Sequence, residues 1–206
     1  MAGSLPISKG SRPVVGVLAL QGDFREHIAV LRSLGADARP LRRRTELSEI
    51  GGLVIPGGES SVMDKLARAF GLAEPLKDAI GSGMPVYGTC AGLIMIADRV
   101  IDAISGQRSL GGLDIAVRRN AFGSQLDSFE TDLDIPVLGE PPVHAVFIRA
   151  PIVESVGVGV RVLSALPDGR IVAVEQGNLL GTSFHPEMTG DTRFHEYFLD
   201  RVRASR

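Results

Sequence analysis

The chain has 206 residues, enough for one domain with a substantial core, and nothing in its composition requires a second domain. The formal net charge of −2 gives no reason to expect a nucleic-acid or membrane-surface partner. The first dozen residues lack the apolar core of a secretory signal, and nowhere do about 18 apolar residues follow one another, so we expect a cytoplasmic protein with no membrane partner. We expect residues 1–12 to be a disordered extension and residues 13–206 to form a single domain.

The N-terminal half alternates short apolar runs with segments of helical periodicity. Near-continuous apolar runs are typical of strands that helices cover on both faces. Asp23 is placed to cap the first helix, and Gly35 is a stop signal for it. The expected elements are a strand at 14–20, a helix at 23–34, a weak strand at 37–41, a strand at 52–56, helices at 61–70 and 72–81, and a strand that begins near residue 84. Such alternation predicts a mostly parallel sheet.

After about residue 108 the pattern changes to short strands separated by turn signals. The turns at 167–169 and 177–178 separate three apolar segments and predict an antiparallel meander. The expected strands lie at 113–119, around 126–135, at 144–150, 160–166, 170–176 and 179–184, and a final helix spans 191–203. The whole pattern predicts an α/β protein with a three-layer, flavodoxin-like fold. A mostly parallel central sheet has helices on both faces, and an antiparallel strand extension lies in the C-terminal half.

The stretch from 84 to 97 places the single cysteine of the chain, Cys90, between a strand and a helix. The spacing Gly88-x-Cys90-x-Gly92 has the form of a nucleophile elbow, whose central residue is strained and exposed while the glycines let strand and helix approach closely. Amide N–H groups gather where a helix begins and favour the thiolate over the thiol. A lone cysteine is commonly a small buried hydrophobe, but the flanking glycines favour a nucleophile here.

A thiolate nucleophile needs a base and a group that orients the base. His185 directly follows the apolar run 179–184, and Glu187 lies two residues further on. Residues two apart on an extended backbone point to the same side, so Glu187 can hold the imidazole of His185. The other histidines are expected to have surface or structural roles: His27, His144 and His195. The sequence therefore predicts a catalytic set of Cys90, His185 and Glu187.

Several segments also resemble a known family. The elbow GTCAG, the segment HPE at His185 and the segment PGGES at 56–60 resemble the class I, or triad, glutamine amidotransferases. Within that class, five segments between residues 14 and 193 closely resemble the glutaminase subunits of pyridoxal 5′-phosphate synthase. These segments are LALQGDFREH, IPGGESS, RRNAFGSQLDSFE, VFIRAP and TSFHPEMTGD. One departure is Ser124, where many members of the family have Arg.

The resemblance implies hydrolysis of L-glutamine to L-glutamate and ammonia. The ammonia would pass to a synthase subunit that makes pyridoxal 5′-phosphate from ribose 5-phosphate and glyceraldehyde 3-phosphate. Cys90 would attack the side-chain amide carbon, His185 would carry the proton to the leaving ammonia, and Glu187 would orient His185. The backbone N–H groups of Gly58 and Ala91 would form the oxyanion site. The implied glutamine-contacting positions are Gly58, Glu59, Ser60, Arg119, Ile148 and Arg149.

Gln21 is our candidate for coupling to the partner. It follows the first strand, at the same carboxyl edge of a parallel sheet as Gly58 and Cys90, so it could relay contact with the synthase subunit to the oxyanion loop. No cofactor and no metal are implied, because the sequence has no clustered His/Cys ligand set.

Three other interpretations compete with this one. A glutaminase that serves another synthase, such as imidazole glycerol phosphate synthase, would share the elbow and the His-x-Glu pair, but LQGD, RRNAFGSQ and VFIRAP argue against it. A cysteine peptidase or redox chaperone on a similar sheet is disfavoured by PGGES and HPE. A non-catalytic interaction module would have no use for an intact triad.

Overall fold

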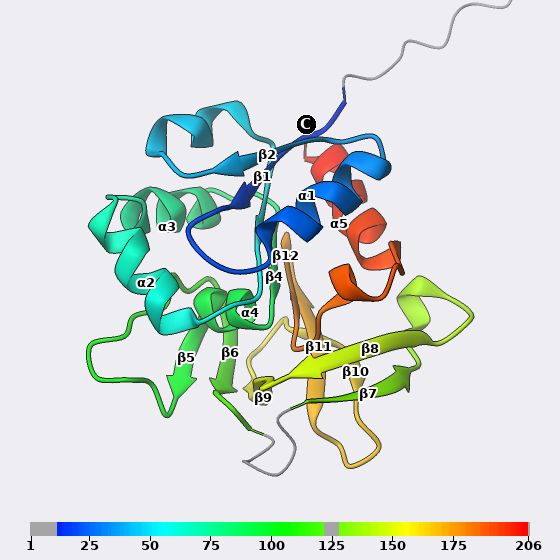
Figure 1. The fold of residues 1–206 in the computed structure, drawn as a ribbon. Coiled ribbons are helices and arrows are strands. Elements are labelled where there is room, and N and C mark those ends of the chain that lie inside the picture. The colour runs from blue at the N-terminus through cyan, green and yellow to red at the C-terminus, as the bar shows by residue number, and fades with distance from the viewer. Residues whose placement is uncertain (1–11, 122–127, 206) are drawn as a thin grey trace, which may run out of the picture.

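The computed structural model describes residues 12–121 and 128–205 (Figure 1). Within these residues a ten-stranded sheet has the order β2-β1-β3-β4-β12-β11-β9-β6-β5, with β10 paired to β11. The first five strands in this order run parallel to one another. They are β1 (Val14–Leu18), β2 (Asp37–Leu41), β3 (Gly52–Ile55), β4 (Val86–Thr89) and β12 (Leu179–Thr182). Every residue of β3, β4 and β12 is buried, as strands covered on both faces must be.

Helices cover both faces of the parallel strands and make the three layers that the sequence predicts. On one face lie α1 (Phe24–Ser33) and α5 (Arg193–Ala204), and on the other α2 (Ser60–Ala69), α3 (Ala73–Gly81) and α4 (Ala91–Ile96) (Figure 1). Leu31 and Phe198 belong to the first apolar cluster with Val54, whereas Met63 and Leu76 belong to the second. Burying each large apolar side chain stabilises the fold by about 1.5–3 kcal/mol, so the two clusters hold the helices against the two faces of the sheet.

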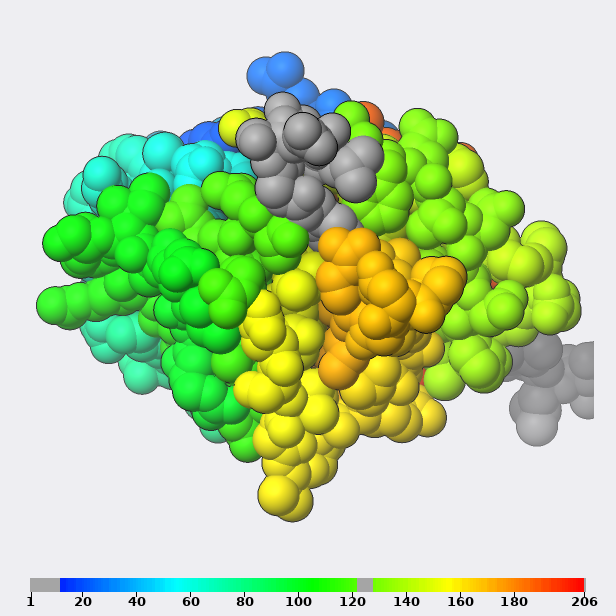
Figure 2. All heavy atoms as spheres, turned by 90° about the horizontal axis from the view of Figure 1, so that it is seen from below, coloured from blue at the N-terminus to red at the C-terminus, as the bar shows by residue number. Residues whose placement is uncertain are grey.

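The C-terminal half extends the sheet with antiparallel pairing. β11 (Ile171–Gln176) joins β12, β10 (Arg161–Ala165) and β9 (Ile152–Val156), and β9 pairs with β6 (Leu113–Arg118), which runs parallel to β5 (Ala97–Ile101). A separate antiparallel pair consists of β7 (Ser128–Leu133) and β8 (Val143–Ile148). Seen from below in Figure 2, the green, yellow and orange segments of this extension form one face of the molecule. Short 3₁₀ turns are η1 (Arg44–Glu49), η2 (Pro136–Leu138) and η3 (Pro186–Met188).

Three local expectations need correction. The apolar run after Cys90 is helical for six residues only, and Ala97 turns into the extended conformation to begin β5, a strand that the sequence pattern did not predict. β9 was not predicted either. Asp23 occupies the N-cap position of α1 but makes no capping hydrogen bond through its side chain, because that side chain faces His185 instead.

Two expectations lie outside the described residues: the disordered extension, apart from its last residue, and the departure at Ser124. Within residues 12–121 and 128–205, no helix combines the length and the apolar character needed to cross a membrane.

Candidate active site

The nucleophile elbow is present at the junction of β4 and α4. Cys90 has φ 48° and ψ −103°, a strained backbone conformation for a residue other than glycine. The flanking glycines are required by contact distances: a Cβ at Gly88 would lie 2.6 Å from the backbone of Gly92, and a Cβ at Gly92 would lie 1.9 Å from the carbonyl oxygen of Ile55. The amide of Cys90 donates to the Thr182 oxygen at 2.8 Å, which ties the elbow to β12.

The cysteine is less open than the elbow pattern predicts. Only 6% of Cys90 is exposed, because the end of β8 lies over it, with the Ile148 carbonyl oxygen 4.0 Å from Sγ. The exposed part lines a cleft of about 310 Å³. A small molecule entering this cleft therefore reaches a sulfur that is otherwise shielded from water.

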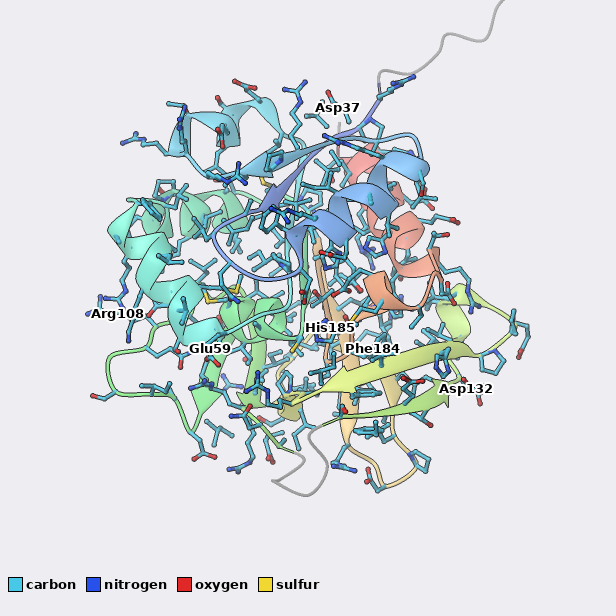
Figure 3. The ribbon with its side chains drawn as sticks, viewed as in Figure 1. Asp37, Glu59, Arg108, Asp132, Phe184 and His185 are labelled. Atoms are coloured by element: carbon cyan, nitrogen blue, oxygen red, sulfur yellow. The ribbon has the colours of Figure 1, made fainter. Side chains whose placement is uncertain are left out.

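His185 and Glu187 follow β12, the strand next to β4. Parallel pairing puts the carboxyl ends of both strands at one edge, so residues far apart in sequence converge there. His185 Nδ1 donates to Glu187 Oε1 at 2.8 Å, and His185 and Cys90 line the same cleft. In Figure 3, His185 lies beside Phe184 where β12 leads into η3, near the centre of the molecule. The structure brings the three predicted catalytic residues together in the order Cys90, His185, Glu187.

The electrostatics favour a charged imidazole. Burial opposes protonation of His185, but hydrogen bonds with Cys90 and Glu187, together with their negative charges, outweigh it and raise the pKa of His185 to about 10. Burial also raises the pKa of Glu187, and the hydrogen bond from His185 offsets part of that rise. His185 is therefore an imidazolium at neutral pH, placed between the sulfur of Cys90 and the buried side chain of Glu187.

The loop after β3 supplies the other side of the cleft. Gly58 has φ +146°, a conformation that only glycine adopts readily, and a Cβ there would lie 2.4 Å from Gln21 Oε1. Gln21 Oε1 accepts the amide of Glu59 at 2.8 Å, and the amide of Asp23 donates to the Gly57 carbonyl at 3.3 Å. Because N–H and C=O point oppositely across a trans peptide, the Gly58 N–H is directed away from α1.

Ala91 provides a second amide near the sulfur. It is the first residue of α4, and first-turn amides have no acceptor within their own helix. The backbone N–H groups of Gly58 and Ala91 both belong to residues that line the cleft with Cys90. The oxyanion site expected from these two donors stays a prediction.

Most of the predicted glutamine-contacting residues line the cleft. Those of them that line it, with Cys90 and His185, are Gly58, Glu59, Arg119, Ile148 and Arg149. Glu59 lies beside α2 in Figure 3, on the same edge of the sheet as His185. Arg149 has φ 43° and Asn120 has φ 45°, so with Cys90 three non-glycine residues of the cleft have a positive φ. Ser60 is buried outside this lining and accepts a hydrogen bond from the Gln107 side chain at 3.0 Å.

Sequence reasoning missed one member of this network, Gln107. Arg119 donates to Gln107 Oε1 at 2.9 Å and to Glu59 Oε1 at 2.8 Å, so the guanidinium is held on two sides within the cleft. Gln107 also connects Arg119 to Ser60. It stands in the irregular segment between β5 and β6, where no pattern in the chain signals a role. Other cleft residues that the sequence did not single out as site residues are Asp23, Ile94, Asn120 and Met188.

The histidines outside the triad fall into two kinds. His144 is exposed on β8 and bonds to Asp132 and Glu130, which raises its pKa and fits the surface role expected for it. His27 and His195 are completely buried, and His27 lies against Glu187.

One group of the described residues has side-chain atoms spaced to hold a metal: Asp23, His185 and Glu187, within 4.8 Å of one another. In this structure His185 Nδ1 is already hydrogen-bonded to Glu187 Oε1.

A parallel sheet that carries a cysteine elbow on one strand and a His–Glu pair after its neighbour defines the class I glutamine amidotransferase fold. Residues 17–204 match the model of the SNO glutamine amidotransferase family, and the chain belongs to this family. It is similar to the pyridoxal 5′-phosphate synthase subunit PdxT of Leifsonia xyli subsp. xyli, with 72% identity over 192 residues, 93% of this chain and 97% of the relative. The subunit of that name from Clavibacter sepedonicus is 67% identical over 202 residues, 98% of this chain and 97% of the relative.

Solved structures agree on the fold. A crystal structure of a glutamine amidotransferase superposes with a TM-score of 0.86 at 45% identity, covering 92% of this chain and 98% of the other. A chain in the structure of PurLQS from Thermotoga maritima has a TM-score of 0.66 at 18% identity over 93% of this chain and 99% of the other, which shows a shared fold alone.

Proposed function

We propose that the chain is the glutaminase subunit of a pyridoxal 5′-phosphate synthase. It hydrolyses L-glutamine to L-glutamate and ammonia, and a partner synthase subunit uses the ammonia with ribose 5-phosphate and glyceraldehyde 3-phosphate. The observation that carries the proposal is the Cys90–His185–Glu187 set at the base of a cleft lined by Glu59 and Arg149. The relatives named PdxT, at up to 72% identity over nearly the whole chain, support the choice of synthase.

In the first half of the reaction, the Cys90 thiolate attacks the side-chain amide carbon of glutamine. The charge that develops on the amide oxygen is met by the N–H groups of Gly58 and Ala91, and such donors typically contribute ~10²–10³ in rate each. His185 gives its proton to the nitrogen as the C–N bond breaks, so ammonia leaves and a glutamyl thioester remains.

In the second half, the neutral His185 takes a proton from water, and the hydroxide attacks the thioester. The C–S bond breaks, glutamate leaves, and the thiolate and the imidazolium are restored. Glu187 remains an acceptor for His185 Nδ1 throughout, so the ring keeps one orientation in both halves.

Recognition of free glutamine needs donors for its α-carboxylate and an acceptor for its α-ammonium. Arg119 and Arg149 supply donors, and Glu59 supplies an acceptor, all from the lining of the same cleft. Arg119 and Glu59 form an ion pair at 2.8 Å, which keeps the guanidinium and the carboxylate next to each other before substrate enters. Ile148 and the peptide at Gly58 flank the apolar part of the substrate chain.

The alternative partner, an imidazole glycerol phosphate synthase, is not favoured by the relatives, which carry the other name. The experiment that tests reaction and partner together measures glutamate release from glutamine by the purified chain, with and without each candidate synthase. We expect stimulation by the synthase subunit for pyridoxal 5′-phosphate and none by the other. No glutamate release with either partner would contradict the reaction, and stimulation by the wrong synthase would contradict the partner.

A further inference from the structure

Two buried histidines lie directly behind the triad, on helices that the sequence places at opposite ends of the chain. His27 on α1 and His195 on α5 have no exposed surface. His27 Nδ1 lies 2.9 Å from His195 Nε2, and His27 Nε2 lies 3.1 Å from Thr89 Oγ1. Thr89 is the last residue of β4, immediately before the nucleophile. The two rings thus connect α5 to the elbow through the interior.

The same ring faces the triad carboxylate. Glu187 Oε1 accepts from His185, while Oε2 is buried and makes no hydrogen bond that meets ordinary geometry. His27 Nε2 lies 3.4 Å from this second oxygen. Leaving a buried carboxylate oxygen without a donor is costly, since the ionised form then loses the stabilisation that water would give.

The arrangement of partners selects one tautomer of His27. If the proton were on Nδ1, a lone pair on Nε2 would face the carboxylate oxygen at 3.4 Å, and His195 would be left with a buried N–H on Nδ1 that has no acceptor. With the proton on Nε2, His27 donates to Thr89 and holds the partial positive charge of that N–H 3.4 Å from Glu187 Oε2, and His195 Nε2 donates to His27 Nδ1. Only a lone pair on His195 Nδ1 then lacks a partner, which costs less than an orphaned donor.

We propose that His27 is a positioning residue for the glutaminase triad: its neutral ring places an Nε2–H group beside the outer oxygen of Glu187, and His195 fixes the tautomer that makes this possible. The chain of contacts extends the triad to five residues. His27 holds the carboxylate in place and ionised, so that Glu187 can in turn stabilise the imidazolium of His185. The inference rests on the proposed function only in that this triad does the chemistry.

Charge placement around the carboxylate agrees with this role. The titratable groups that face Glu187 are His185, His27, Tyr87 and Asp23. Burial, together with neighbouring His195 and His185, holds the pKa of His27 well below its usual range, and burial lowers the pKa of His195 to about 4. Both rings are therefore neutral at neutral pH, and neither competes with His185 for the proton.

The test compares His27→Leu, which removes the donor, with His27→Gln, whose side-chain amide can reach the position of Nε2. The readout is the rate at which iodoacetamide alkylates Cys90 in the purified chain, measured across pH, with glutamate release by the complete complex as a second readout. We expect H27L to be alkylated about tenfold more slowly at neutral pH. The difference should disappear as pH rises, because hydroxide then deprotonates the thiol without the help of an imidazolium. H27Q should recover most of the rate.

His144→Leu is the matched control, since it removes a histidine that is bonded to two acids but lies on the exposed face of β8. It should leave the alkylation profile unchanged. His195→Phe should slow alkylation less than H27L does, and the double variant should be no slower than H27L, because His195 acts only through His27. If H27L lowers the melting temperature and leaves the pH profile at its wild-type position, His27 is a packing residue and the proposal is wrong.

A measurement on the unmodified protein keeps the proposal testable even where a variant fails to fold. Nitrogen-15 spectra of the histidine rings distinguish the two neutral tautomers and the imidazolium. We expect His27 to be neutral with its proton on Nε2 at neutral pH. A proton on Nδ1, or a charged ring, would overturn the assignment, and neither result would bear on whether the chain hydrolyses glutamine.

Discussion

Replacement of Gln21 by alanine tests how the oxyanion loop is held. Gln21 Oε1 accepts the Glu59 amide at 2.8 Å and rests against Gly58. Losing one such neutral hydrogen bond costs about 1 kcal/mol, a factor of about five in the population of the ordered loop. The free chain should be poorly active, because two adjacent glycines leave the Gly57–Gly58 peptide free to turn away from the oxyanion until the synthase docks. We expect Q21A to lower the stimulated kcat about fivefold with little change in KM.

The assay is glutamate release at saturating glutamine, titrated with the synthase subunit. Gln176→Ala is a matched control, because Gln176 Oε1 also accepts a backbone amide at 2.8 Å, that of Asp114, in the extension of the sheet. Q176A should be stimulated as the wild type is. If Q21A is stimulated fully, or if the free wild-type chain already turns over at the rate of the complex, the proposed coupling through Gln21 is refuted and the triad is unaffected.

Three further predictions concern the triad itself. Cys90→Ala and Cys90→Ser should abolish turnover in a folded protein, checked by circular dichroism beside the activity assay, and a diazo-ketone analogue of glutamine should label Cys90 alone by mass spectrometry. Glu187→Gln should retain more activity than His185→Ala, because Glu187 orients the base without taking part in bond making; the opposite order in kcat would reverse the roles. Because the pKa of His185 is raised to about 10, its ring should stay charged at about pH 8, where an unperturbed histidine is neutral. Cys90→Ala should lower that pKa, since the hydrogen bond and charge of the sulfur are lost while burial remains; a wild-type His185 seen neutral at about pH 8 by NMR would contradict this.

Much of the fold could be predicted because the local signals agree with the tertiary structure. The strand predicted at 37–41 is β2, and the meander predicted after residue 160 is β10, β11 and β12. β5 could not be predicted, because the apolar run of α4 continues into it without a glycine or proline to mark the change. β9 is short and follows Pro151, and its pairing with β6 depends on contacts remote in sequence.

Prediction of the site from the sequence was also limited to residues with a local signal. Cys90, His185 and Glu187 carry their own local signals, an elbow and an i, i+2 pair at the end of a strand. His27 and His195 do not, because each looks like an ordinary residue on an amphipathic helix. Their meeting, across 168 residues of sequence, depends on how α1 and α5 pack on one face of the sheet.

The position of β12 also sets when the enzyme becomes competent during its own synthesis. The strand lies in the middle of the sheet, between β4 and β11, yet it comes from the last part of the chain. Chains fold as they leave the ribosome, N-terminal parts first. A growing polypeptide therefore displays Cys90 long before it possesses Thr182, which anchors the elbow, or the base that follows it. A partly synthesised chain therefore lacks the base needed to hydrolyse glutamine. A chain truncated before β12 lacks that base permanently.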